Sequence, residues 1–274
     1  MSRIGVIGAR GALGSFLVEH FRLAGFDVDA FSTRSEDPAL RLDVLRDDPT
    51  NYVRDLDSVI YCAWSTHDRT IEAQMAHVDA ASRCAEVCAG SGTQFIFTGT
   101  VLAAEATESQ YGVHKFLAEQ RVACAGGVCL RIGLLADDAY PFLVTQLRRM
   151  VKKFGPAAGI LDWPVLPVSS MAVGEAIRAE IEGESAGALV WLAPREATSL
   201  AEVAAWGTSR TSRRSRGRSI VSAVARLPVR GGIVGRQVDA LAGLIGAPLS
   251  GEECRDPANG PVPRDDWQRG LAPA

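Results

Sequence analysis

A glycine-rich turn near the amino terminus constrains the fold most. Residues 4–7 (IGVI) form an apolar run, residues 8–14 (GARGALG) follow at once, and an amphipathic stretch continues to about residue 24. A strand, a G-x-x-G-x-x-G turn and a helix in this order are typical of folds that hold a dinucleotide pyrophosphate at a helix amino terminus. A turn without a ligand is the alternative. The residues expected to line the cofactor are Gly8, Arg10, Gly11, Ala12, Leu13 and Gly14.

Short apolar runs alternate with amphipathic stretches of helix length as far as about residue 132. The pattern predicts strands near 3–8, 26–32, 57–62, 93–98 and 127–132. It predicts helices over 12–24, 40–54, 69–90 and 110–125. Such alternation is typical of βαβ units around a parallel sheet. We therefore expect an α/β fold, a doubly wound Rossmann-type sheet with a small C-terminal substrate lobe.

The second half of the chain has a looser pattern, with helices predicted over 141–154, 171–183, 199–206 and 233–245. We expect one structural unit, made of a dinucleotide-binding core over 1–135 and a mixed substrate-binding lobe with a loosely ordered tail over 136–274. Residues 208–218 hold five arginines among serines and threonines. Such a run is usually a solvated loop. A lid over a phosphate-bearing substrate is the alternative, because guanidinium groups fit phosphate oxygens.

Composition favours a small-molecule substrate. The net charge of −3 gives no attraction to nucleic acid or to an anionic membrane, which both require a basic surface. No run reaches the roughly 20 apolar residues of a membrane span, and we expect no signal peptide before the first strand. The six cysteines have neither metal-site nor secreted-framework spacing, so we expect a reducing compartment, the cytoplasm. They are Cys62, Cys84, Cys88, Cys124, Cys129 and Cys254.

The end of the second strand indicates which dinucleotide is used. A carboxylate at this point would hold the ribose 2′-hydroxyl of NAD, but the chain has Ser32, Thr33 and Arg34 instead. These groups, with Arg10, could meet a 2′-phosphate, so NADP is predicted and NAD stays possible; each arginine could also be plain surface. Asp43 is expected to accept from the adenine amino group.

A tyrosine and a lysine four residues apart are the candidate proton-transfer pair. Tyr111 and Lys115 would share one face of a helix. A phenol titrates near pH 10, and an adjacent cation lowers its pKa toward neutrality, where it can exchange a proton with a carbonyl or alcohol oxygen. Thr100, eleven residues before Tyr111, ends a buried strand and could hold a substrate carbonyl. Its alternative role is a turn or cap residue.

Together these segments resemble the short-chain dehydrogenase/reductase superfamily. The glycine turn, residues 59–63 (VIYCA), the hydroxyl-ended strand and residues 111–119 (YGVHKFLAE) are similar to its extended branch, the NAD-dependent epimerase/dehydratase family, over about residues 3–135. The resemblance implies that Thr100 polarises a carbonyl and that Tyr111 is the acid/base. It also implies that Lys115 partners the phenol and contacts the cofactor ribose, with Ala63 among the cofactor-binding residues.

The chain departs from the family pattern at several places. His77 stands where the family commonly has an asparagine, and could relay a proton or only pack. The spacing from Thr100 to Tyr111 is short, which implies a trimmed loop. Val101 and Leu102 replace the acidic groups of sugar dehydratases, which favours simple hydride transfer. Two further residues could line a substrate pocket or only pack, namely Trp64 and His67.

The function predicted is that of an NADP-dependent ketoreductase or alcohol dehydrogenase, acting on a nucleotide-linked sugar or another secondary metabolite. A nucleotide-sugar epimerase that retains its cofactor is one alternative. A non-catalytic NADP-binding sensor is another. A homodimer through the helices at 69–90 and 110–125 would suit the family, although a monomer could show similar helix faces.

Overall fold

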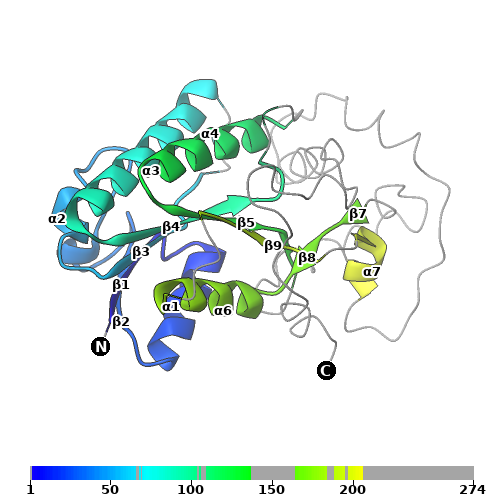
Figure 1. The fold of residues 1–274 in the computed structure, drawn as a ribbon, viewed down its shortest axis with the longest axis horizontal. Coiled ribbons are helices and arrows are strands. Elements are labelled where there is room, and N and C mark those ends of the chain that lie inside the picture. Colours follow the sequence, from blue (N-terminus) through cyan, green and yellow to red (C-terminus); the bar gives the residue numbers. More distant parts are fainter. Residues whose placement is uncertain are drawn as a thin grey trace.

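A parallel sheet organises the computed structural model, which describes residues 2–65, 68, 70–103, 105, 109–136, 164–183, 188–194 and 197–205 (Figure 1). The six-stranded sheet has the order β2-β1-β3-β4-β5-β9, and every neighbouring pair is parallel. Its strands are β1 (Arg3–Ile7), β2 (Asp27–Phe31), β3 (Ser58–Tyr61), β4 (Gln94–Thr100), β5 (Val128–Ile132) and β9 (Leu189–Leu192). The predicted α/β fold class is confirmed.

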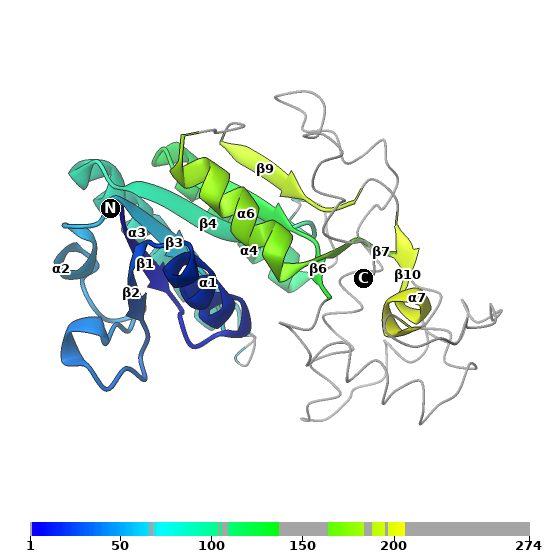
Figure 2. The ribbon, with the colours of Figure 1, turned by 90° about the horizontal axis from the view of Figure 1, so that it is seen from below.

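Helices cover both faces of this sheet (Figures 1 and 2). α1 (Ala12–Leu23) and α6 (Ser170–Ile181) contact each other on one face, and α3 (Ile71–Ser91) and α4 (Gln110–Cys124) do so on the other. Because both faces are covered, the central strands are almost continuously apolar. β9 and α6 follow residue 135, so the sheet layer draws on both predicted segments of the chain.

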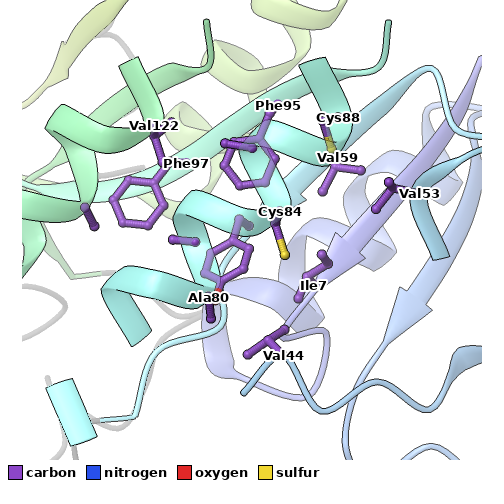
Figure 3. Packing of buried hydrophobic residues seen from close by; sticks show 14 of the residues in the cluster. Ile7, Val44, Val53, Val59, Ala80, Cys84, Cys88, Phe95, Phe97 and Val122 are labelled. Carbon is purple, nitrogen blue, oxygen red and sulfur yellow. The ribbon is translucent and has the colours of Figure 1, made fainter. Parts of the chain in front are cut away.

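Side chains alternate between two apolar clusters along the central strands. On β4, Phe95 and Phe97 point toward α3 and α4, where Cys84 and Val122 lie in the same cluster (Figure 3). Ile96 belongs to the cluster under α1 and α6. This period of two is what fixes the register of a strand buried on both faces. The ends of the strands are thereby held at defined positions beneath the helices.

Short elements complete the described chain. β6 (Leu134–Leu135) pairs with β8 (Pro167–Val168), β7 (Pro164–Val165) pairs with β10 (Thr198–Ser199), and α7 (Leu200–Ala205) follows. The helices predicted over 171–183 and 199–206 thus exist as α6 and α7. Those predicted over 141–154 and 233–245, and the arginine-rich segment 208–218, lie outside the described residues. Among the helices of the described part, none is both long and apolar enough to cross a bilayer.

The helix predicted over 40–54 is wrong. The structure has a 3₁₀ turn, η1 (Pro38–Leu40), and a single helical turn, α2 (Thr50–Val53). Between them an extended segment pairs with the end of β2, since Ser32 N donates to Leu40 O and Leu42 N donates to Ser32 O, at 3.1 and 3.3 Å. Aspartates explain the difference: Asp43 Oδ1 accepts from Leu45 N, and such local side-chain bonds compete with a helix.

Candidate active site

The candidate site lies where the strand order reverses. β1 pairs with β2 on one side and with β3 on the other, and ligands of doubly wound sheets bind beyond the carboxyl ends of strands at such a point. The glycine turn is tied to both neighbours of β1. Gly8 N and Ala9 N donate to Phe31 O at 3.0 and 3.1 Å, and Cys62 N donates to Ile7 O at 2.8 Å.

The glycines of this turn allow close backbone packing. Gly8 has φ +89°, and a Cβ built there would lie 2.7 Å from Ala63 N. A Cβ at Gly14 would overlap the Gly8 carbonyl oxygen, so α1 could not start so close to β1 with any other residue. Gly11 is the N-cap of α1 and provides no side-chain hydrogen bond. The helix therefore begins with backbone N–H groups that its cap leaves open, which fits a pyrophosphate.

The residues predicted to contact the adenosine half lie around this turn. Ser32 is buried, and its Oγ accepts from Arg34 N at 3.1 Å, so the hydroxyl shapes the turn. Thr33, Arg34 and Arg10 are exposed. Asp43 uses its carboxylate within its own loop, where Oδ1 accepts from Leu45 N and Oδ2 lies 3.6 Å from Arg46 Nε. Of these residues, Arg10 and Arg34 therefore present positively charged groups at the surface.

Hydroxyl residues end β4 beside the start of α4. Thr98 Oγ1 donates to Tyr61 O at 2.9 Å, which locks β4 to β3. Thr100 is buried, and its Oγ1 accepts from Leu102 N at 3.3 Å. Ser109 caps α4 by accepting from Gly112 N at 3.2 Å. These bonds fix the end of β4 and the first turn of α4.

Tyr111 and Lys115 lie on one face of α4, and Lys115 is almost fully buried, with 3% of its surface exposed. Its Nζ donates to Thr98 O at 2.8 Å. The ammonium lies 4.2 Å from the ring centroid of Trp64, 4.5 Å from that of Phe97 and 5.9 Å from that of Tyr111. The structure therefore brings together the phenol, the ammonium and the end of β4, with an indole against the pair.

Burial perturbs the ionisable groups along α4. It lowers the pKa of Lys115 to about 7, although the carboxylate of Glu119 one turn later opposes this change. Burial likewise raises the pKa of Glu119 to about 7, opposed by Arg131, whose Nε lies 2.9 Å from Glu119 Oε2. Lys115 thus changes charge near neutrality, where a proton-transfer site must work.

Three residues beside this pair were undervalued or missed by the sequence interpretation. Trp64 Nε1 donates to Gln74 Oε1 at 2.9 Å, and the Trp64 ring stacks on His77 with centroids 5.4 Å apart. His77 Nε2 accepts from Ser65 N at 3.3 Å, and burial, followed by the charge of Lys115, lowers the pKa of His77. Gln74 precedes His77 by three positions, and this helical spacing was the available signal. His67 lies outside the described residues.

Comparisons with solved structures identify the fold. A short-chain dehydrogenase/reductase superfamily protein from Agrobacterium tumefaciens, solved with bound NAD, superposes with a TM-score of 0.56 and 18% identity, over 74% of this chain and 80% of that protein. This chain has the fold of the short-chain dehydrogenase/reductases. A scan against protein-family models gives no match, and a search of curated proteins gives no significant one.

Two nucleotide-sugar enzymes of known structure share this dehydrogenase/reductase fold. A dTDP-4-dehydrorhamnose reductase from Bacillus anthracis, in complex with NADP, has a TM-score of 0.59 and 17% identity, over 74% of this chain and 79% of the reductase. A UDP-N-acetylglucosamine 4-epimerase from Bacillus cereus has a TM-score of 0.58 and 16% identity, over 78% of this chain and 89% of the epimerase. At these identities the likeness concerns the fold.

Proposed function

We propose that this chain is an NADP-dependent oxidoreductase that transfers a hydride between the nicotinamide and a ketone or secondary alcohol. The observation that carries the proposal is the ammonium of Lys115, which lies near the Tyr111 ring and donates to Thr98 O on β4, two residues before Thr100 at the end of that strand. Phenol, ammonium and hydroxyl are the groups that a carbonyl reduction needs from the protein.

The chain's own residues provide the proton and hold the substrate, while the dinucleotide, when bound, provides the hydride. Thr100 Oγ1 accepts from Leu102 N, so its own proton can be donated to a substrate carbonyl oxygen. Tyr111 then donates its hydroxyl proton to that oxygen and becomes a phenolate. The ammonium of Lys115, on the same face of α4, stabilises the negative charge that forms. The reverse reaction returns the proton to the phenolate.

The choice of NADP rests on the end of β2. No carboxylate side chain occupies positions 32–34, and the exposed guanidiniums of Arg10 and Arg34 carry the positive charge that a 2′-phosphate requires. We expect the affinity for NADPH to exceed that for NADH, measured by the fluorescence of the bound dinucleotide.

A nucleotide-linked sugar is the substrate class that we favour, because the similar structures include enzymes named for UDP and dTDP sugars. The epimerase among them supports a second candidate, a nucleotide-sugar epimerase that retains its cofactor. Net consumption of added NADPH with dTDP-4-dehydrorhamnose or a simpler ketone supports the reductase. Interconversion of UDP-sugars without net consumption supports the epimerase.

Replacement of the phenol tests the mechanism. We expect Tyr111→Phe to lower turnover by at least about 100-fold, the usual contribution of a positioned acid, with NADPH binding unchanged. Tyr52→Phe is a matched control, because Tyr52 lies on α2, where its ring packs edge-on against Phe31. Unchanged turnover in Tyr111→Phe would refute the mechanism. NADPH binding without turnover of either substrate class by the wild-type protein would leave only the sensor.

A further inference from the structure

Trp64 contacts both members of the proton-transfer pair. Its ring lies under the ammonium of Lys115, with Nζ 4.2 Å from the centroid. The same ring meets Tyr111 edge-on, with centroids 6.4 Å apart and planes at 90°. It also packs against Phe97, the second ring beside the ammonium. A single side chain, placed just after β3, thus contacts the two residues that α4 contributes.

Trp64 is itself held from α3. Its Nε1 donates to Oε1 of Gln74, a side chain with 4% of its surface exposed. Gln74 Nε2 donates to the carbonyl oxygens of Ser65 and Asp68, which ties the helix to the segment after β3. The His77 ring stacks on the indole at an interplanar angle of 26°. Hydrogen bonding and stacking together fix the plane of the indole, so its face stays toward Lys115.

We propose that Trp64 is a positioning residue, whose ring keeps Lys115 protonated and directed along α4 toward Tyr111. This inference rests on the proposed function, since it assigns to Trp64 a part in the same proton transfer. The physical reason is the quadrupole of the indole, which attracts a cation over its face most strongly where water is excluded. Lys115 is in that situation.

The other groups around Lys115 define what Trp64 adds. Within the part of the chain that the structure describes, the ionisable side chains that interact with the ammonium are Glu119 and Tyr111 on α4, Cys62 after β3, Cys129 on β5 and His77 on α3. Burial raises the pKa of both thiols, so they are neutral at pH 7. The carboxylate of Glu119 also forms an ion pair with Arg131. The two aromatic faces, with Thr98 O, are therefore the main uncharged groups that favour the ammonium over the amine.

The pKa of Lys115 can be measured directly, because the chain has only three lysines, Lys115, Lys152 and Lys153. In protein labelled at the lysine ε-carbon, the Lys115 signal is the one that disappears in Lys115→Met. Trp64→Leu keeps apolar volume without a ring, and Trp64→Phe keeps a ring. We expect the Leu variant to lower the pKa by about 0.5 to 1.5 pH units, the Phe variant by less.

A matched control and a second variant complete this test. Phe26→Leu removes a partly buried aromatic ring from the opposite face of the sheet, so it should leave the pKa of Lys115 unchanged. Gln74→Met keeps the indole but removes the acceptor of its Nε1 hydrogen bond, so it should also lower the pKa of Lys115. This variant provides the test if Trp64→Leu does not fold. An unchanged pKa of Lys115 in the folded Trp64→Leu or Gln74→Met protein would overturn the proposal.

Kinetics separates this proposal from the proposed function. Turnover that needs the ammonium falls as pH rises through the pKa of Lys115. The alkaline limb of the pH profile should therefore move to lower pH in Trp64→Leu, by as much as the pKa itself. A wild-type protein without turnover would refute the proposed function, while the NMR titration would still decide the role of Trp64. A lower pKa with an unmoved alkaline limb would refute the link to proton transfer.

Discussion

Replacing Lys115 with methionine should stabilise the protein at neutral pH and remove its activity. Burial lowers the pKa of Lys115 from 10.5 to about 7 in the folded chain. The unfolded chain therefore binds more protons than the folded chain between these two values, so the free energy of unfolding of the wild type rises with pH across this window. Methionine fills a similar volume and carries no proton, so its variant lacks this dependence.

The magnitude follows from the width of the window. Each pH unit inside it is worth about 1.4 kcal/mol for one proton, so the wild type should gain about 3 kcal/mol on the variant between about pH 8 and about pH 10. Below this window Lys115 is charged in both the folded and the unfolded chain, so burial of its charge lowers the free energy of unfolding of the wild type by the full amount. The lost hydrogen bond to Thr98 O adds a pH-independent offset of about 1 kcal/mol against the variant.

Urea unfolding of both proteins at several pH values measures this difference. Titration of other groups largely cancels, because only the difference between the two proteins is used. Glu119 titrates near the lower end of the window, so the comparison belongs above about pH 8, where its carboxylate is mostly ionised. A difference that stays constant from about pH 8 to about pH 10 would refute the assignment of a depressed pKa to Lys115.

Three further changes test the cofactor turn and the buried ion pair. Gly8→Ala should lose at least about 1 kcal/mol more stability than Gly25→Ala, since both glycines have φ +89° but only Gly8 has backbone within 3 Å of the added Cβ; urea unfolding measures both. Arg34→Glu should lower the ratio of NADPH to NADH affinity by about tenfold, measured by titration; an unchanged ratio would remove Arg34 from the site. Glu119→Gln should lower the free energy of unfolding by about 3 kcal/mol, because the half-buried guanidinium of Arg131 loses its anion; urea unfolding should show a smaller loss in the double variant Glu119→Gln, Arg131→Met.

The parts of the fold that the sequence predicted are those specified by local patterns. The glycine turn and the alternating apolar runs predicted β1 to β5 within about two residues, because strands buried on both faces need continuous apolar residues wherever they occur. The error over 40–54 has a local cause as well. Its apolar spacing suited a helix, but Asp43 and Asp48 bond to backbone N–H groups two residues later. Those bonds favour turns over helix.

The candidate site was predictable only in part, for a different reason. Spacing along α4 put Tyr111 and Lys115 on one face, but no spacing could show how deeply the ammonium is buried. That depth comes from Trp64 and Phe97, which follow or belong to two other strands and meet Lys115 only once the sheet is formed. Contacts between segments so far apart in sequence have no periodic signature.

The burial of Lys115 links the stability of the fold to the chemistry that we propose. An exposed lysine beside a phenol would keep its ordinary pKa, and water would screen its charge from the phenolate. In the dry surroundings made by Trp64, Phe97 and Thr98 O, the same charge acts more strongly on Tyr111, while the folded chain bears the cost of burying it. A protein that only bound the dinucleotide would have no use for this cost. The stability gained in Lys115→Met is therefore a measure of what the fold gives up to keep a cation beside the phenol.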